Sequence, residues 1–227
     1  MENGLTLIPI AHMVSDFSEK FGIPRQSGLA EALESLVVFE PDYRDENALR
    51  GLTGFSHVWL IWEFSKARRE GWSPTVRPPR LGGNQRMGVF ATRSPFRPNP
   101  LGLSCVRLLG VEKHPVYGPV LRVGGADLMD GTPIYDVKPY LPQADCHPEA
   151  RGGFANDTPW HPLAVEVSPA LLEKVPEAKR QALLEVLAQD PRPSYQADPA
   201  RVYGLTFAHL EIKFRVTETT LTVLSIE

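Results

Sequence analysis

The sequence lacks the cysteines of a disulfide-rich or zinc-binding protein and the long apolar runs of a membrane-spanning protein. It has only two cysteines among 227 residues, Cys105 and Cys146, which are too few for a disulfide scaffold and too scattered for a zinc site. No apolar run approaches the roughly 18 residues that a membrane span requires. The N-terminus also lacks a basic segment followed by an apolar one. We therefore expect a cytoplasmic protein with no membrane partner and no bound metal.

Acidic residues are missing from one long stretch of the chain. Between Glu70 and Glu112 there is no Asp or Glu, and the stretch contains arginine but no lysine. These arginines are Arg77, Arg80, Arg86, Arg93, Arg97 and Arg107. A guanidinium group binds carboxylates and phosphates with paired donors and stacks on flat rings. The stretch predicts recognition of an anion or a nucleobase although the net charge is -3, and the alternative is a solvated basic surface.

Three prolines surround Arg97 and Asn99 within residues 95–100. Proline restricts φ and removes a backbone donor, so this loop is a poor sheet strand. A rigid loop loses less entropy when it binds, which favours a preorganised site for a charged ligand. The alternative is that the prolines only end a strand while the arginines pair with acids in residues 127–136.

Short β-branched and aromatic segments in the first two thirds of the chain predict a mainly β fold of the α+β type. The expected strands are 35–40, 57–64, 86–92, 103–112 and 120–128. Gly88, Gly124 and Gly125 lie inside these segments and indicate bends or close backbone contacts. Such glycines favour a small curved barrel, and an open sandwich is the alternative.

The polar segment 143–162 is punctuated by proline and glycine, which predicts a linker or a long crossing loop. It separates an expected β-barrel domain of residues 1–155 from a smaller α+β domain of residues 156–227. In the second domain we expect a helix over about 176–189 and a two-stranded ribbon that turns near 217–220.

Four motifs, in order along the chain, carry a resemblance to a known family. They are "GIPRQSG" at 22–28, "GLTGFSHVWLIWEFSK" at 51–66, "GVFATRSPFRPNP" at 88–100 and "DLMDGTPIYDVKPYLPQAD" at 127–145. The chain resembles the TsaA-like, YaeB or TrmO family over nearly its whole length. The resemblance implies a homodimeric β-barrel methyltransferase that uses S-adenosylmethionine. It also implies the substrate, which is N6 of threonylcarbamoyladenosine next to the anticodon of tRNA.

The resemblance further implies which residues line the cofactor site. They are Pro24, Arg25, Gln26, Ser65, Lys66, Arg93, Leu103, Asp127, Leu128, Met129 and Asp130. A guanidinium suits the carboxylate of the cofactor, and carboxylates suit its amine and hydroxyl groups. The absence of a Gly-x-Gly-x-x-Gly turn agrees with a fold other than a Rossmann sheet.

A general base would assist the reaction, because an acceptor nitrogen conjugated to a carbonyl is a poor nucleophile until its proton begins to leave. Asp130, Tyr135 and Asp136 are the candidates, and the sequence does not select one of them. Asp136 is equally suited to an ion pair with Lys138 on the same face of a strand. His57, between apolar residues, is expected to be structural.

Arginines stand near tyrosines in the C-terminal region, a combination that suits phosphates and stacked bases. The predicted RNA contacts are Arg97, Arg192, Tyr195, Arg201 and Tyr203. The alternative is that this region covers a barrel edge or supports a dimer.

Two other functions are compatible with the sequence. A non-catalytic RNA-binding module would use the arginines and aromatic residues without consuming a cofactor. A phosphate-ester hydrolase would need a divalent metal, whereas the sequence shows no tight cluster of acids and histidines at metal-ligand spacing.

Overall fold

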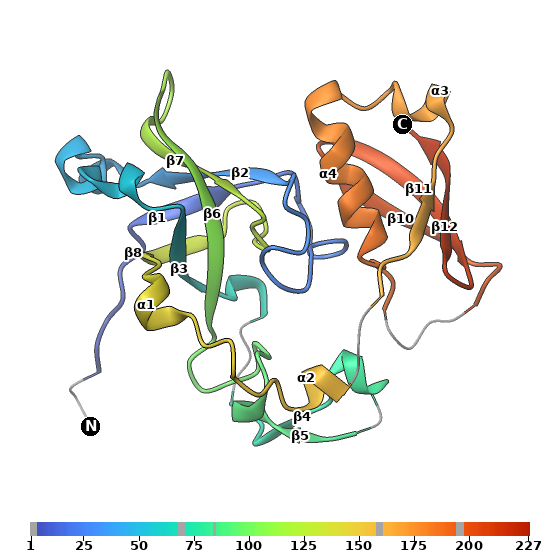
Figure 1. Ribbon diagram of the computed structural model, residues 1–227, viewed down its shortest axis with the longest axis horizontal. Helices are drawn as coiled ribbons and strands as arrows, with labels where there is room; N and C mark the ends of the chain where they lie inside the picture. The colour runs from blue at the N-terminus through green and yellow to red at the C-terminus, as the bar shows by residue number, and fades with distance from the viewer. Residues whose placement is uncertain (1–3, 68–70, 84, 158–160, 194–197) are drawn as a thin grey trace.

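The computed structural model describes residues 4–67, 71–83, 85–157, 161–193 and 198–227. Two β regions lie side by side, with a lobe of short elements below them (Figure 1). Among the described residues, no helix is both long enough and apolar enough to cross a membrane.

Six strands of the N-terminal region form a sheet that closes on itself. They are β1 (Ala11–Val14), β2 (Glu34–Phe39), β3 (His57–Glu63), β6 (Leu101–His114), β7 (Gly118–Gly124) and β8 (Pro133–Pro139). The order is β1-β2-β7-β6-β3-β8, and β1 also pairs with β8, which completes a closed barrel. Every pairing is antiparallel. The mainly β prediction is confirmed.

The inward side chains of these strands form one apolar core, which includes Met13, Val37, Leu60, Leu121 and Ile134. Alternation along the strands produces it: in β3, Val58, Leu60 and Trp62 are buried while the residues between them are only partly buried. The barrel core thus follows directly from the period-two pattern in the sequence.

Short elements connect the strands. They are the 3₁₀ turns η1 (Pro41–Tyr43), η2 (Glu46–Leu49), η3 (Leu52–Gly54), η4 (Ser65–Ala67), η5 (Pro79–Leu81) and η6 (Val89–Ala91), the strands β4 (Thr75–Val76) and β5 (Met87–Gly88), and the helices α1 (Pro142–Asp145) and α2 (Phe154–Asp157). The predicted strand 86–92 is wrong beyond Gly88. There the Thr92 N–H and hydroxyl both bond to the Val89 carbonyl and turn the chain into η6.

The C-terminal region is a four-stranded sheet covered on one face by a helix. Its elements are β9 (Ala164–Glu166), α3 (Pro169–Leu172), α4 (Glu177–Ala188), β10 (Val202–Phe207), β11 (Leu210–Thr217) and β12 (Thr220–Ile226). The sheet order is β10-β11-β12-β9. The predicted helix is confirmed as α4, and the predicted ribbon is β11 and β12, which turn between Thr217 and Thr220.

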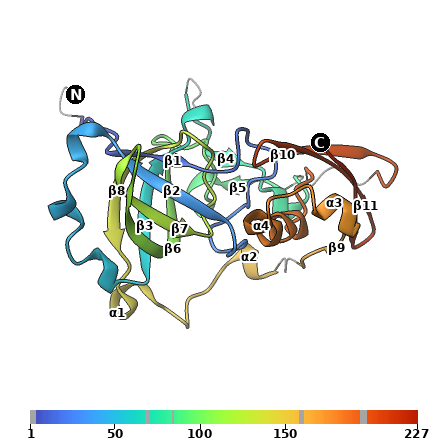
Figure 2. The same cartoon turned by 90° about the horizontal axis from the view of Figure 1, so that it is seen from above.

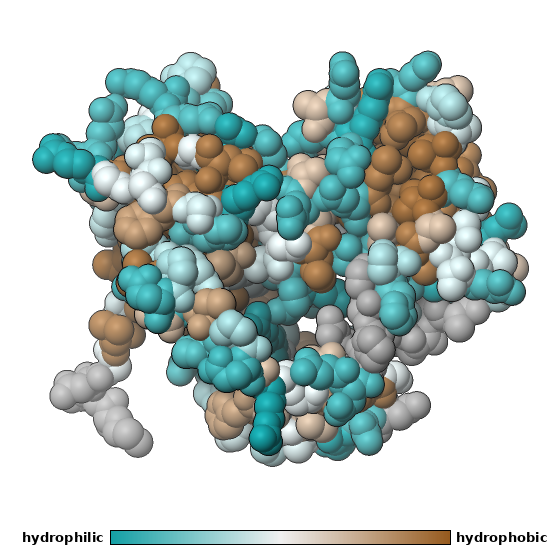
Figure 3. Space-filling view, viewed as in Figure 1, coloured by the Kyte–Doolittle hydropathy of each residue, from teal (hydrophilic) through white to brown (hydrophobic). Residues whose placement is uncertain are grey.

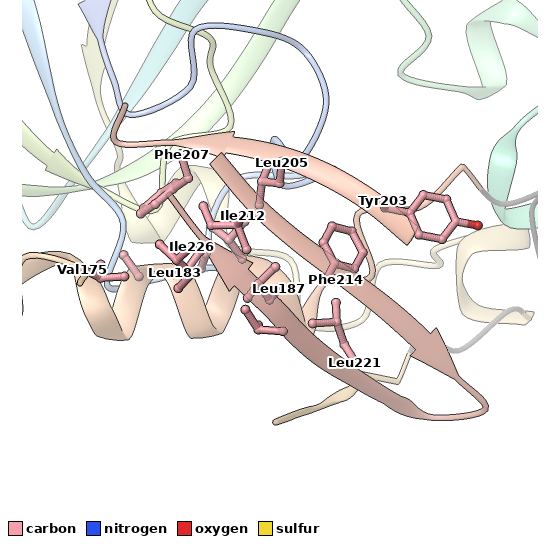
Figure 4. Packing of buried hydrophobic residues seen from close by; sticks show 14 of the residues in the cluster. Val175, Leu183, Leu187, Tyr203, Leu205, Phe207, Ile212, Phe214, Leu221 and Ile226 are labelled. Atoms are coloured by element: carbon pink, nitrogen blue, oxygen red, sulfur yellow. The ribbon is translucent and has the colours of Figure 1, made fainter. Parts of the chain in front are cut away.

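Helix α4 packs its apolar side against this sheet, as Figure 4 shows. Leu183 and Leu187 of the helix meet Leu205, Ile212 and Phe214 of the strands, and all five are at most 1% exposed. Figure 2 shows α4 between the two β regions, seen from above. Residues from the N-terminal region, between β1 and β2, also belong to this core.

Residues 15–33, here called the bridging segment, run between β1 and β2 but pack on the C-terminal core. Phe17, Ala30 and Leu33 are fully buried members of that core. At Gly22, φ is +90° and an added Cβ would lie 2.0 Å from Leu205 Cδ1, so only glycine fits there. The predicted boundary between residues 1–155 and 156–227 stays a prediction, and the bridging segment crosses it in space.

Candidate active site

Polar side chains from three separate segments converge at one end of the barrel. Arg93, just after η6, donates from Nη1 to Gln26 Oε1 of the bridging segment at 2.6 Å. Arg93 is exposed, and this contact uses one of the five N–H donors of its guanidinium. The arginine-bearing loop is thereby tied to the "GIPRQSG" motif, 67 residues away in the chain.

Asp127 is the acid of this cluster. Its Oδ1 accepts a hydrogen bond from the Ser104 hydroxyl at 2.6 Å, and Ser104 Oγ accepts one from Trp62 Nε1 at 2.9 Å. Burial raises the pKa of Asp127, while the Ser104 hydroxyl, backbone N–H groups and the nearby Arg93 charge act in the opposite direction. The carboxyl is thus held in place, beside a cation, in a partly buried position.

Strand pairing brings Ser65 and Lys66, two more of the predicted cofactor residues, close in the fold to the loop that carries Arg93. Strands β3 and β6 pair with Ile61 opposite Leu103, and the Phe64 N–H bonds to the Pro100 carbonyl at 2.9 Å. Ser65 and Lys66 follow directly in η4. Leu103 is 52% exposed, and the alternation along β6 places its side chain on the opposite face of the strand from the buried Ser104.

The loop from Thr92 to Arg97 is held by its own polar side chains. Thr92 Oγ1 accepts from the Ser94 N–H, Ser94 Oγ accepts from the Phe96 N–H, and Arg97 Nη1 donates to the Thr92 carbonyl. These local bonds, together with the prolines, support the expectation of a preorganised loop. Arg97 is engaged within the loop and is only partly exposed.

The other predicted cofactor residues have structural contacts. Pro24 is buried, and Leu128, at 1% exposed, belongs to the barrel core. Arg25 donates from Nη2 to the Arg192 carbonyl at 3.2 Å, and the Met129 carbonyl accepts from the Thr132 hydroxyl. Arg25 is exposed and has further N–H donors for a ligand, whereas the Met129 carbonyl already accepts from both the N–H and the hydroxyl of Thr132.

The glycines at the end of β7 hold the bridging segment against the barrel. Gly125 has φ of +73°, and an added Cβ would lie 3.2 Å from the Gly28 backbone. The Gly28 N–H bonds to the Gly125 carbonyl at 2.8 Å. Close backbone approach, predicted for Gly124 and Gly125, is confirmed; at Gly88 an added Cβ would meet open space.

The three candidate bases have different surroundings. The Tyr135 hydroxyl donates to the carboxylate of Glu63, which is 5% exposed. Asp136 forms the ion pair with Lys138 that its spacing allowed, at 2.8 Å. Asp130 is exposed and accepts from the Ser15 N–H at 3.1 Å.

Sequence reasoning missed Glu63 and Ser104, both of which are buried. The signal for Glu63 was available, because a carboxylate inside an apolar strand needs a hydrogen-bond partner. The signal for Ser104 was weaker, since a serine in a strand has no distinctive spacing. Among the described residues, no group of three or more His, Cys, Asp or Glu could hold a metal ion.

Two of the predicted RNA contacts in the C-terminal region, Arg192 and Tyr203, are largely enclosed by protein. The Arg192 side chain is 14% exposed and bonds to both carboxylate oxygens of Asp190 at 2.8 and 2.9 Å. Tyr203 is 5% exposed and stacks on Phe214 with 5.6 Å between ring centroids. This burial argues against a base stacking on Tyr203, because a base needs an accessible ring face. Tyr195 lies outside the described residues.

Arg201 is the exception in this group. It is exposed, and its guanidinium carbon lies 5.4 Å from the Tyr203 ring centroid. Arg201 therefore remains open to solvent.

Comparison with protein families finds two matches that together span most of the chain. The model of the tRNA-methyltransferase O N-terminal domain matches residues 12–146, and the model of the TrmO C-terminal domain matches residues 161–227.

Comparison with individual proteins gives matches of similar extent. The chain is 43% identical over 221 residues to a tRNA (adenine(37)-N6)-methyltransferase of Escherichia coli, covering 94% of each chain. It is 44% identical over 212 residues to a putative S-adenosylmethionine-dependent methyltransferase, RcsF, of Pseudomonas aeruginosa, covering 90% of this chain and 89% of the other. The crystal structure of TrmO from P. aeruginosa superposes with a TM-score of 0.81 at 36% identity, covering 100% of this chain and 98% of the other.

Proposed function

Because this chain belongs to the tRNA-methyltransferase O family, we propose that it is a tRNA (adenine-N6) methyltransferase that uses S-adenosylmethionine. We further propose that the methyl group goes to N6 of threonylcarbamoyladenosine next to the anticodon. Relatives named for the adenine(37)-N6 reaction support the base and the atom. Support for the threonylcarbamoyl group comes only from the resemblance of the sequence motifs.

The observation that carries this proposal is the cluster of Gln26, Arg93 and Asp127. Three of the motifs that resemble the family supply one residue each, and the structure joins them through the 2.6 Å Arg93–Gln26 bond and the Arg93 charge near Asp127. Residues so far apart in the chain have no local reason to converge. Their common position is expected of a ligand site.

The chemistry of this cluster fits the cofactor. Arg93 has further donors for a carboxylate, Asp127 is an acceptor for an amine or a hydroxyl, and Leu103 offers an exposed apolar surface. When bound, S-adenosylmethionine supplies a methyl group on a positively charged sulfur. Holding that ligand beside the loop of residues 92–100 is the contribution of these side chains.

The main catalytic task of the chain is to place the acceptor nitrogen in line with the methyl group, since positioning lowers the barrier of such a displacement strongly. As the bond from nitrogen to methyl forms, the N6 proton must leave. Tyr135 is bonded to Glu63 and Asp136 to Lys138, whereas the contact described for Asp130 is a backbone N–H rather than a cation. Asp130 is therefore our first choice among the three as proton acceptor.

The proposal includes two further expectations. A homodimer is implied by the resemblance, and Leu103, which is exposed on the outer face of β6, is compatible with a subunit contact on that face. A cytoplasmic location follows from the proposed substrate, because tRNA is used in that compartment.

Calorimetric titration with S-adenosylmethionine, followed by nucleoside analysis of tRNA from a strain that lacks the protein, tests the function. We expect saturable binding and the loss of one N6-methylated nucleoside, restored when the purified enzyme and the cofactor are added. Binding of tRNA without any binding of S-adenosylmethionine would instead identify a non-catalytic RNA-binding module.

A further inference from the structure

Two aromatic side chains are exposed together outside both hydrophobic cores. Trp72 is 52% exposed and Phe90 is 71% exposed. Their ring centroids are 6.0 Å apart with an interplanar angle of 29°, which is a stacked arrangement. Within the described residues, neither ring belongs to the apolar core of the barrel or of the C-terminal region.

The ribbon of β4 and β5 brings these rings together. Thr75 pairs with Gly88, and the Val89 N–H bonds to the Pro74 carbonyl at 2.9 Å. The residues before β4 and after β5 therefore leave the ribbon at the same end. The hydrogen bonds between β4 and β5 therefore determine the position of the two rings.

Exposed aromatic pairs need an explanation, because two large rings left in water forgo the free energy gained by burial. The lobe that carries β4 and β5 lies apart from both β regions in Figure 1, and its surface in Figure 3 is mostly hydrophilic. The rings thus contribute little to any described core. They are available to a ligand.

The charge around the pair identifies the kind of ligand. Arg86 donates from Nη1 to Thr75 Oγ1 at 2.9 Å, which places its guanidinium beside β4. Arg77 is exposed and directly follows β4, at the other end of the two-residue ribbon from the rings. Residues 71–111 contain no acid. A flat apolar surface flanked by arginines matches a polyanion with flat rings, which is a single-stranded segment of nucleic acid.

The pair is also close to the proposed active site along the chain. Arg93 follows Phe90 by three residues, which spans at most about 11 Å between Cα atoms. A nucleotide stacked on the rings would therefore lie near a base presented to the cluster of Gln26, Arg93 and Asp127.

We propose that Trp72 and Phe90 form a stacking site for an unpaired nucleobase of the tRNA, with Arg77 and Arg86 facing the adjoining phosphates. This inference rests on the proposed function, because it assumes that tRNA is the substrate. A second copy of the chain is the less favoured occupant. A two-fold contact would set this acid-free, arginine-rich segment against itself.

The first experiment compares Trp72→Ala, Phe90→Ala and the conservative Trp72→Phe with the wild-type protein. The probe is tRNA purified from a strain that lacks the protein. We expect each alanine variant to raise the tRNA dissociation constant about 5- to 150-fold, and Trp72→Phe to retain most of the affinity. Tyr43→Ala is the matched control, because Tyr43 is an aromatic residue 39% exposed in η1, and it should leave tRNA affinity unchanged.

The second experiment identifies the base. An anticodon-arm RNA is prepared with one abasic site at a time in the loop, and each RNA is titrated with wild-type protein and with Trp72→Ala. If the rings stack on a base, one abasic position weakens binding to the wild type and causes no further loss with the variant. Equal, additive losses at every position would overturn the inference.

The remaining outcomes separate this inference from the proposed function. Calorimetry with S-adenosylmethionine and the mass in solution are measured for every variant. A wild-type enzyme that methylates tRNA, with alanine variants of unchanged tRNA affinity, would overturn the stacking site alone. A variant that changes the mass but not the tRNA affinity would show that the pair is a self-association surface. A wild type that neither binds S-adenosylmethionine nor methylates tRNA would overturn the proposed function itself.

Discussion

The barrel region and the C-terminal region use their polar residues in different ways. In the barrel region, Arg93 and Asp127 meet side chains from distant motifs and remain partly open to a ligand. In the C-terminal region, Arg192 is closed off by Asp190, and Tyr203 is buried. Residues of the same types are therefore partly open to solvent in the candidate site and enclosed by protein at Arg192 and Tyr203.

The bridging segment connects these two roles. Its apolar residues, such as Phe17 and Leu33, belong to the C-terminal core, while Gln26 reaches Arg93 in the candidate active site. Further bonds join it to α4 and the residue that follows: Glu185 accepts from the Ala32 N–H, and Gln189 donates to the Leu29 carbonyl, both at 2.8 Å. The C-terminal region thus supports the bridging segment, which carries Gln26 of the candidate active site.

The largest effect is expected from Leu205→Ala, which tests whether the two regions depend on each other. Leu205 is fully buried beneath Gly22 of the bridging segment. Its truncation should lower the free energy of unfolding by about 2–5 kcal/mol, measured by urea denaturation. It should also weaken binding of S-adenosylmethionine, because the bridging segment loses its support.

Leu224→Ala is the control for this variant, since Leu224 is 42% exposed and should change stability by no more than about 0.5 kcal/mol. If Leu205→Ala is less stable yet binds the cofactor as the wild type does, the two regions are energetically independent.

Arg93→Ala tests the ligand role of the barrel loop. A charge-assisted hydrogen bond contributes roughly 1.5–3 kcal/mol, so S-adenosylmethionine affinity should fall about 10- to 150-fold in a folded protein. Arg77→Ala is the matched control, because Arg77 is exposed in the same acid-free stretch but not bonded to Gln26. Unchanged calorimetric affinity in folded Arg93→Ala would remove Arg93 from the site.

Asp127→Asn tests the electrostatics of the cluster through the pH dependence of stability without cofactor. Burial raises the pKa of Asp127 in the folded protein, so between the unfolded-state pKa and the higher folded-state pKa the folded state binds more protons. The free energy of unfolding should therefore fall as the pH rises through this interval. The asparagine variant, which does not titrate, should lose that part of the slope; an identical slope in both proteins would contradict the raised pKa.

The smallest effect is expected from Arg201→Ala, which tests whether the C-terminal region touches tRNA at all. One lost phosphate contact should reduce the salt dependence of tRNA binding by about 0.7–0.9 in the log–log slope. Arg192→Ala should leave that slope unchanged, because Asp190 already neutralises Arg192. Equal slopes for wild type and Arg201→Ala would limit the region to structural support.

Much of the architecture could be predicted because it depends on local patterns. The strands at 35–40, 57–64 and 103–112 were expected from β-branched and aromatic residues, and α4 from its apolar face and proline boundaries. The predicted strand 120–128 is wrong beyond Gly124, because Gly125 adopts a positive φ and the chain leaves β7 there. Strands β1, β4, β8, β9 and β10 were missed. They are short or bounded by prolines and charges, so they become strands only through pairing with neighbours.

The candidate site was predicted as a set of residues but not as an arrangement. The motifs identified Gln26, Arg93 and Asp127, yet nothing in their spacing showed that the Arg93 guanidinium would bond to Gln26. Glu63 and Ser104 were overlooked because their significance depends on burial, which depends on barrel closure. The partners of Arg192 and Tyr203 were likewise invisible in the sequence.

By itself, the sequence determined the family, the mainly β character and the acid-free arginine loop, because these depend on residue identity and short-range periodicity. Only the tertiary structure decided which of those residues lie together and which of them are exposed. Closing the barrel and packing the bridging segment on the C-terminal core bring together groups from residues 26, 93 and 127, and bury others of the same type. Exposure and proximity are properties of the packed chain, since each side chain has its surroundings set by segments far away in the sequence.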